Sequence, residues 1–185
     1  MHPPTATDAA LVERLRSGDR GAFRELYARF SQATFGFLLR LAGRRDVAED
    51  LHQEVWLSIA RHATRLAPDT DLAAWIFTVA RNRFRSSSRR RAEPLAARAP
   101  EEQLAGAPPS EDPGCRDLER ALASLPEPYR ELLLLVAIEG LDTTRVAAVL
   151  AIRPDAARQR LARARAALAE LVDAQGRSPG RRMTS

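Results

Sequence analysis

Apolar residues recur at three- and four-residue steps along the N-terminal half of the chain, which is the spacing of amphipathic helices. The pattern predicts helices over residues 9–17, 19–30, 46–65 and 75–91, with a further apolar set at 35–43. Asp19 and Asp71 stand where N-caps belong, because a side-chain oxygen there can accept from the first free backbone N–H groups. Asp46 and Glu49 have the spacing of a capping box.

Helical periodicity disappears over residues 92–116. Prolines and acidic residues are frequent in this stretch, a composition typical of a flexible, acidic linker. Helical spacing then returns over residues 117–173, and the polar tail at 174–185 is expected to be disordered. We therefore expect an all-α protein with two small helical domains, 9–91 and 117–173, joined by a flexible linker.

The second domain ends in two helices joined by a tight turn. The first is predicted over Thr143–Leu150, and the second is expected to begin with Asp155 as its N-cap. This arrangement is typical of a helix-turn-helix, in which the second helix enters the major groove and Arg and Gln read base edges. Its outward-facing candidates are Arg158, Gln159, Arg160 and Arg163. An arginine-rich helix in a bundle would show a similar pattern.

The predicted helix over 75–91 has an apolar arc and a basic arc. The basic arc holds Thr78, Arg81, Asn82, Arg85 and Arg89. No acidic residue occurs between Asp71 and Glu93. A fixed row of guanidinium groups beside an amide suits a phosphate backbone with base edges nearby. A solvated basic face would have the same composition.

The predicted helix over 46–65 has an apolar residue on its polar side. Leu57 lies there among Asp50, Gln53 and Glu54. An apolar anchor with a polar rim is the anatomy of a protein docking site. A single exposed leucine on an acidic face is also common in proteins without such a site.

The composition and charge of the chain further limit the classes of function that it can have. The 185 residues carry a formal charge of +5, which favours an anionic partner. The single Cys115 cannot form an internal disulfide and predicts a reducing, cytoplasmic setting. The N-terminal residues lack a signal-peptide pattern, and the longest apolar run, 132–138, is too short to insert into a membrane. The three histidines and the glycines form no catalytic, metal or phosphate-binding constellation, so we expect no enzyme, metal or cofactor.

Taken together, the motifs resemble those of the extracytoplasmic-function (ECF) branch of bacterial sigma factors, the promoter-recognition subunits of RNA polymerase. The resemblance rests on Ala-Glu-Asp-Leu-His-Gln-Glu-Val-Trp-Leu at 48–57 and Ala-Trp-Ile-Phe-Thr-Val-Ala-Arg-Asn at 74–82. Leu125-Pro126, the helix-turn-helix and the Arg-Ala-Arg at 163–165 add to it. The resemblance covers about residues 9–91 and 117–172.

Membership of this family would assign a role to each candidate surface. The helix at 46–65 would dock on the β′ clamp helices of the polymerase core, through Asp50, Gln53, Glu54 and Leu57. The helix at 75–91 would read the −10 element, through Thr78, Arg81, Asn82, Arg85 and Arg89. The loop at 66–73 would shape a pocket for a flipped-out base. The C-terminal domain would read the −35 element near the β flap, through Arg158, Gln159, Arg160 and Arg163.

The resemblance also implies a further partner, and it sets a requirement that the structure has to meet. An anti-sigma factor would cover the docking face, and the acidic linker would run towards the RNA exit path. The interpretation requires the outward side of residues 49–61, and the guanidinium groups of Arg81 and Arg85, to be free of internal partners.

The sequence departs from the family pattern in the helix-turn-helix. Ala151 stands where the family usually has Gly, Ala156-Ala157 replace a common Thr-Val pair, and Thr143 replaces a frequent aromatic residue. Because smaller side chains bury less apolar surface, we expect a less stable C-terminal domain or an unusual −35 preference.

Two other functions fit the same features. An autonomous helix-turn-helix regulator would bind its operator alone, usually as a symmetric dimer, although no dimerisation heptads occur. A helical adaptor that does not bind DNA would use its arginines for solubility.

Overall fold

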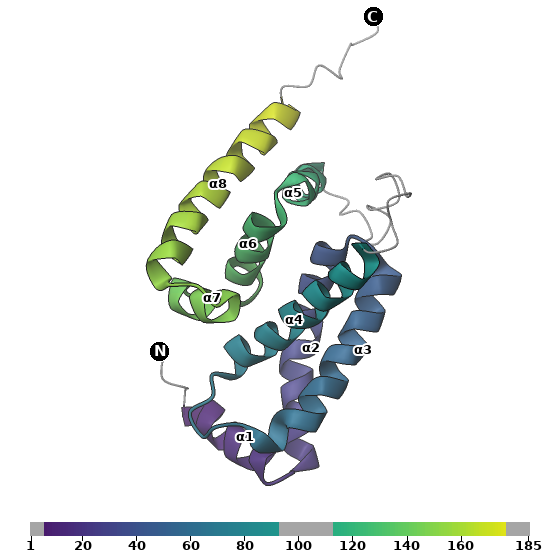
Figure 1. Cartoon of the computed structure of the whole chain (residues 1–185), viewed down its shortest axis with the longest axis vertical. Coiled ribbons are helices and arrows are strands. Elements are labelled where there is room, and N and C mark those ends of the chain that lie inside the picture. Colours follow the sequence, from purple (N-terminus) through teal and green to yellow (C-terminus); the bar gives the residue numbers. More distant parts are fainter. Residues whose placement is uncertain (1–5, 93–112, 177–185) are drawn as a thin grey trace, which may run out of the picture.

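The computed structural model describes residues 6–92 and 113–176 of the chain (Figure 1). Within these ranges every regular element is helical. The elements are α1 (Ala6–Arg16), α2 (Arg20–Ala42), α3 (Arg45–His62), η1 (Ala63–Arg65), α4 (Leu72–Ala92), α5 (Pro113–Ser124), α6 (Glu127–Glu139), α7 (Thr143–Leu150) and α8 (Pro154–Gly176). None of the described helices is long and apolar enough to cross a membrane.

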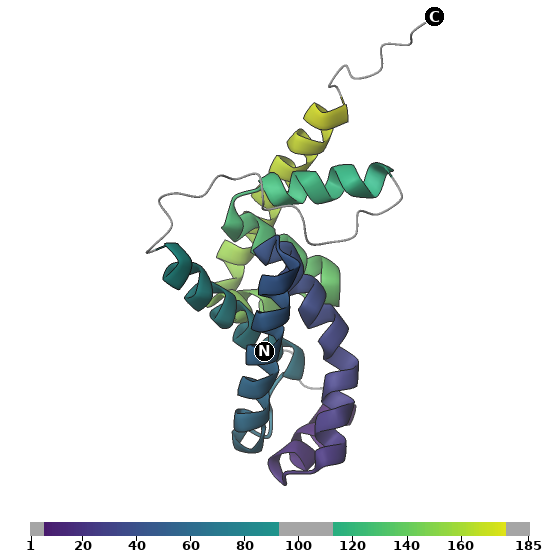
Figure 2. The ribbon, with the colours of Figure 1, turned by 90° about the vertical axis from the view of Figure 1, so that its right-hand side faces the viewer.

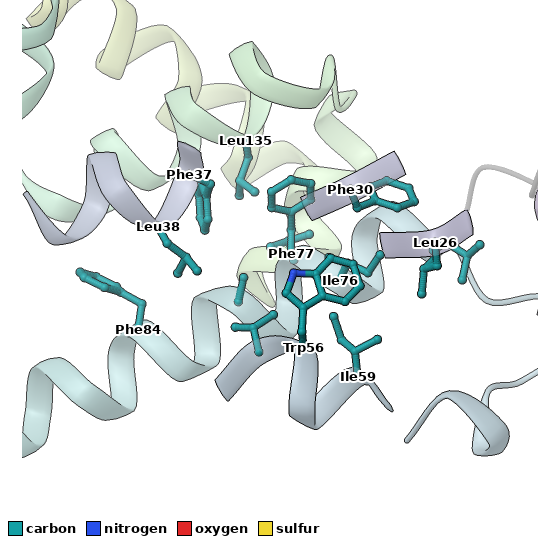
Figure 3. Packing of buried hydrophobic residues seen from close by; sticks show 14 of the residues in the cluster. Leu26, Phe30, Phe37, Leu38, Trp56, Ile59, Ile76, Phe77, Phe84 and Leu135 are labelled. Carbon is teal, nitrogen blue, oxygen red and sulfur yellow. The ribbon is translucent and has the colours of Figure 1, made fainter. Parts of the chain in front are cut away.

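The N-terminal unit, α1 to α4, packs around an apolar core. Phe37 of α2 and Phe77 of α4 meet edge to face, with ring centroids 5.4 Å apart (Figure 3). The apolar sets at 19–30 and 35–43 belong to one continuous helix, α2, rather than to separate segments. Thr34 lies between the two sets, and its buried hydroxyl is satisfied within the helix by donating to the carbonyl of Phe30, 2.6 Å away.

Helix starts follow the predicted caps in some places and not in others. Asp19 accepts from the N–H of Gly21 at 2.7 Å, and Asp71 accepts from that of Ala74 at 3.1 Å, as predicted. The capping box at Asp46 and Glu49 was a wrong prediction, since α3 begins at Arg45 and its N-cap position makes no side-chain cap hydrogen bond. Both carboxylates form ion pairs with neighbouring arginines instead.

The C-terminal unit, α5 to α8, is built around the buried run Leu132–Leu135 of α6. The helix-turn-helix consists of α7 and α8, and α7 has the predicted bounds. Because α8 begins at Pro154, Asp155 lies inside its first turn and does not cap it, contrary to the prediction. Asp155 pairs with Arg158. Ala92 belongs to α4 and α5 begins at Pro113, both within the stretch expected to be linker, and residues 93–112 lie outside the described residues.

The two units are in direct contact. Helix α6 packs against α2, and α7 packs against α4 (Figure 1 and Figure 2). Leu135 of α6 lies beside Phe37 and Phe77, and all three belong to one continuous cluster of buried residues (Figure 3). The C-terminal unit therefore covers part of the face formed by α2 and α4.

Candidate protein and nucleic-acid interfaces

Helix α3 presents a polar face with one apolar side chain at its centre. Its buried side contributes Val47, Leu51, Val55 and Ile59 to the core. On the opposite side Leu57 is 59% exposed, although leucine is normally buried. Gln53 is exposed one turn before Leu57 and Asp50 is exposed two turns before it, and Glu54 is half-buried. The structure thus brings all four predicted docking residues together and leaves this side of the helix uncovered.

Two of the acidic side chains on this face are not engaged by other described side chains. Among the described residues, no ion pair or hydrogen bond involves the carboxylates of Asp50 or Glu54. The nearby Glu49 is paired with Arg45, 2.8 Å away. An exposed apolar anchor with unpaired carboxylates beside it suits a partner that offers an apolar pocket bordered by basic groups.

The opposite side of α3 is held in place by a polar contact that the sequence pattern did not predict. The indole N–H of Trp56 donates to Nε2 of His52, 2.8 Å away. The rings of Tyr27 and Phe35 lie next to this pair. Burial lowers the pKa of His52, which favours the neutral imidazole that accepts this hydrogen bond. Because Tyr27 and Phe35 belong to α2, these ring contacts hold this side of α3 against α2 and thereby orient Leu57 outward.

The basic arc of α4 is only partly accessible. Asn82, Arg85 and Arg89 are exposed. Together with Ser86, Ser88 and Glu127 they line a recess of about 580 Å³. Thr78 is half-buried, and its hydroxyl donates to the carbonyl of Ala74, 2.7 Å away. A cluster of guanidinium groups beside an amide can hold a phosphate and reach a base edge.

Arg81 does not project outward as predicted, and the requirement that its guanidinium group be free of internal partners is not met. Arg81 is 8% exposed, and its Nε donates to Oε2 of Glu131 at 3.1 Å. Glu131 belongs to α6 and is 3% exposed. The reason is tertiary: α6 packs on α2 and α7 packs on α4, and this brings the carboxylate at the start of the apolar run of α6 to the guanidinium group. No spacing within the helix at 75–91 could have indicated a partner that lies 50 residues later in the chain.

A second ion pair crosses between the units at the loop before α4. Nε of Arg145, in α7, lies 2.6 Å from Oδ2 of Asp71. The other oxygen of Asp71 caps α4. Asp71 therefore both starts the basic helix and holds the C-terminal unit beside it.

The recognition surface of α8 is open. Arg158, Gln159 and Arg163 are exposed, and Arg160 is half-buried. Ala157 and Ala164 are fully buried on the opposite side, where the helix packs on α5, α6 and α7. Gln159, Arg160 and Arg163 also line a recess of about 480 Å³. Its other lining residues are Pro126, Pro128, Tyr129 and Ala156. All four predicted residues thus remain at least partly accessible on α8.

Family models match both units of the chain. Sigma-70 region 2 matches residues 26–93, and sigma-70 region 4 matches residues 115–168. The RNA polymerase sigma factor CarQ of Myxococcus xanthus is 36% identical over 165 residues, which cover 87% of this chain and 95% of that protein. The chain belongs to the ECF branch of the sigma-70 family of RNA polymerase sigma factors. The resemblance stated from the sequence is therefore confirmed.

Other relatives support the same assignment for the sigma factor. ECF RNA polymerase sigma factor EcfG of Rhodopseudomonas palustris is 32% identical and covers 76% of this chain and 79% of its own length. Among solved structures, CnrH in complex with the cytosolic domain of CnrY superposes with a TM-score of 0.70. That match is 28% identical and covers 90% of this chain and 97% of CnrH. RpoE of Bartonella quintana, in complex with the anti-sigma factor NepR, gives a TM-score of 0.73 at 26% identity. That match covers 82% of this chain and 96% of RpoE.

In the sigma factor, α3 and α4 belong to region 2, and the helix-turn-helix belongs to region 4. The face of α3 around Leu57 and the basic arc thus lie on one domain, and the exposed side of α8 lies on the other. Sigma factors are transcription initiation factors rather than enzymes, which agrees with the function expected from the sequence.

Proposed function

We propose that this chain binds RNA polymerase core and directs it to specific promoters through three separate surfaces. The observation that carries the proposal is Leu57, an exposed leucine on a helix whose other large apolar side chains are buried. Its acidic and amide neighbours form a polar rim that matches the anatomy of a binding hot spot.

The first surface is the outer side of α3, which would dock on the β′ clamp helices. Asp50, Gln53 and Glu54 would set the orientation, and Leu57 would fill an apolar pocket on the partner. Truncating such an anchor typically costs 2 kcal/mol or more, which corresponds to a loss of affinity of at least about 30-fold.

The second surface is the basic arc of α4, which would bind the −10 element and the melted strand. Asn82 would contact a base edge, and Arg85 and Arg89 would contact phosphates. Arg81 and Thr78 would join them once the face is uncovered. These roles follow from the chemistry of guanidinium and amide groups next to nucleic acid.

The third surface is the open side of α8, which would read the −35 element while region 4 rests near the β flap. Gln159 and Arg163 have the side-chain chemistry that reads adenine and guanine in the major groove, and Arg158 and Arg160 suit phosphate contacts.

The setting of this activity would be the cytoplasm, where the polymerase works. An anti-sigma factor is a further expected partner, since the structural relatives CnrH and RpoE were solved with CnrY and with NepR. Such an inhibitor would compete for the outer side of α3.

A reconstitution with bacterial core polymerase tests the proposal. The full chain should form a stable complex with core, and sequencing of the transcripts made should reveal a restricted set of promoters. Leu57→Arg should abolish the complex. Leu118→Arg is the matched control, because Leu118 is also an exposed leucine (43%) but lies on α5, away from the docking face.

The alternatives give different results in the same experiment. An autonomous regulator would bind a specific duplex tightly as an isolated dimer and would not need core. An adaptor would bind neither core nor DNA. Equal core binding by wild type and Leu57→Arg would contradict the docking assignment.

A further inference from the structure

The C-terminal part of α4 carries three serines that the proposed function does not use. Ser86, Ser87 and Ser88 follow one another between two arginines. Serine is a weaker helix former than alanine, leucine or arginine, because its hydroxyl competes for backbone groups. Three serines in succession inside a regular helix therefore need a reason other than helix formation.

The surroundings of these serines differ. Ser87 is buried, whereas Ser86 is half-buried and lines the recess of about 580 Å³ together with Asn82. Earlier on the helix, the hydroxyl of Thr78 donates to a backbone carbonyl one turn before it. The hydroxyl of Ser86 makes no such hydrogen bond within the described part of the chain. Ser86 thus presents a free hydroxyl at the edge of the recess.

We propose that Ser86 is a phosphorylation site, and that Arg89 and Arg90 hold its phosphate ester and thereby withdraw the basic arc from promoter DNA. The proposal rests on the proposed function of α4 and adds a negative regulator to that surface. The partner is a serine kinase that selects basic residues before its acceptor. Arg83 stands three positions before Ser86, and Arg85 stands directly before it.

The spacing of the two arginines suits the capture of a phosphate on Ser86. Residues three and four apart lie on the same side of a helix, with Cβ atoms about 5–6 Å apart. Arg89 and Arg90 occupy these two positions, and both are exposed without an ion pair to any described residue. Helical side chains lean towards the N-terminus, so long side chains at these positions can reach back to Ser86. An acidic group that precedes its basic partner is also the favoured order for such pairs.

A phosphate ester would reverse the charge at this point of α4. Phosphoserine carries about −1.5 to −2 charges at neutral pH and forms charge-assisted hydrogen bonds with guanidinium groups. The phosphates of DNA would have to compete for the same donors and would also be repelled. Only Glu127 is acidic among the residues that line the recess, so the ester would meet mainly hydrogen-bond donors there.

The end of α4 is the part of this helix that opens most easily to a kinase. Phe84 is the last buried apolar residue among the described side chains of α4. The turns beyond it have few apolar contacts, so they open at a lower free-energy cost than the rest of the helix. In the reaction the hydroxyl oxygen of Ser86 bonds to the γ-phosphorus of ATP as the bond to the β–γ bridging oxygen breaks. ADP leaves, and the hydroxyl proton passes to the catalytic base of the kinase.

The first experiment tests the acceptor. The full chain is incubated with ATP and the catalytic subunit of cyclic-AMP-dependent protein kinase, which selects basic residues before its acceptor. Mass-spectrometric fragmentation of the intact chain then locates the phosphate. We expect it at Ser86 and not at the buried Ser87, and we expect Ser86→Ala to lose it. Absence of phosphate from Ser86 overturns the proposed site.

The second experiment tests the capture of the phosphate. Phosphoserine is inserted at position 86 through an expanded genetic code, and phosphorus NMR follows its second pKa, which is about 6 when unperturbed. We expect a lower pKa in the folded chain than in denaturant, because neighbouring cations favour the dianion. The double variant Arg89→Gln, Arg90→Gln should return the pKa towards the denatured value. Equal values in folded and denatured chain overturn the capture.

The third experiment tests the effect on DNA with polymerase core present. Phosphoserine at position 86 should lower promoter affinity about tenfold and reduce the salt slope by about 1, because Arg89 loses its phosphate contact. Phosphoserine in place of Ser17 is the charge-matched control, since Ser17 is exposed in the turn between α1 and α2, away from the C-terminal end of α4 (Figure 1 and Figure 2). It should leave both values unchanged, and core affinity should stay the same in both proteins. An unchanged promoter affinity with phosphoserine at position 86 overturns the regulatory role.

The outcome is separable from that of the proposed function. The kinase reaction and the phosphorus titration need neither core nor DNA, so they test the site and the capture alone. A failure of the wild-type chain to bind core would contradict the proposed function while leaving those two results intact.

Discussion

Trp56 donates its indole N–H to the imidazole of His52 one turn earlier on α3, across 2.8 Å. The same imidazole nitrogen lies 3.0 Å from the carbonyl oxygen of Ser31 on α2. The pair sits behind the docking face, so the protonation state of one histidine is linked to the packing that orients Leu57.

This relationship predicts a pH dependence of stability. Burial lowers the pKa of His52 below its ordinary value of 6.5, so the unfolded state binds a proton at a higher pH than the folded state does. The free energy of unfolding should therefore fall as the pH is lowered through 6.5 and should go on falling until the folded pKa is passed. Thermal melts between pH 7.5 and pH 5.5 measure it.

His52→Gln provides the comparison, because an amide can still accept from Trp56 and does not titrate. Its melting temperature should change less over the same range. Carboxylates with lowered pKa values, such as Asp19 and Asp46, act at lower pH and do not interfere. A decline of equal size in wild type and His52→Gln would show that another group is responsible.

The turn of the helix-turn-helix leads to a second prediction. Ala151 adopts φ 53° and ψ 47°, the left-handed region that glycine occupies without steric cost. Ala151→Gly should raise the free energy of unfolding by about 0.5–1 kcal/mol, since relief of the strain exceeds the added flexibility of the unfolded chain. In a chain of this size the melting temperature should rise by about 1–4 °C.

Ala148→Gly is the matched control on the same short helix. Ala148 is exposed and lies within α7, so glycine there should lower stability by about 0.5–1 kcal/mol. Opposite signs for the two substitutions support the strain at Ala151. A destabilising Ala151→Gly would mean that the turn tolerates alanine without cost.

The features that depend on local sequence could be predicted, whereas those that depend on packing between helices could not. Helices α3, α4 and α7 could be predicted because their apolar spacing and flanking breaks lie within the segment itself. The continuity of α2 could not, since the buried hydroxyl of Thr34 takes a core position that reads as polar in the sequence. Exposure of Leu57 followed directly from its place on the outer face of α3.

The burial of Arg81 shows where sequence patterns stop being informative. The periodicity of α4 correctly places Arg81 opposite the apolar arc, but a second domain then buries this residue of the basic arc. Glu131 carried a weak signal, as a carboxylate directly before the buried leucines of α6. Only the packing of α6 and α7 on region 2 connects the two residues.

The basic arc of α4 predicts a separation between core binding and promoter melting. Asn82→Ala should reduce open-complex formation about tenfold, corresponding to the loss of one base contact of about 1.4 kcal/mol. Arg85→Ala should weaken promoter binding and reduce its salt slope by about 1, because one phosphate contact is lost. Permanganate footprinting and filter binding over a salt series measure these effects.

Arg24→Ala is the charge-matched control, since Arg24 is an exposed arginine on α2. It should leave the open complex and the salt slope unchanged. Core affinity, measured separately, should stay at the wild-type value in all three variants. If core affinity fell together with the open complex, α4 would be part of the docking surface instead.

The open side of α8 predicts that its residues divide into those that read bases and those that hold phosphates. Gln159→Ala should weaken binding to favoured promoters by about 1–3 kcal/mol and relax the base preference at one −35 position.

Arg165 provides the comparison, because it is an exposed arginine on the same helix, beside the residues that are predicted to read bases. Arg165→Ala should weaken binding to all promoters to a similar degree, because a phosphate contact does not depend on the base sequence. Transcription from a library randomised at the −35 element separates the two results, because a base reader changes the ranking of sequences whereas a phosphate contact scales them all. A uniform loss in Gln159→Ala would remove this residue from the set that reads the −35 element.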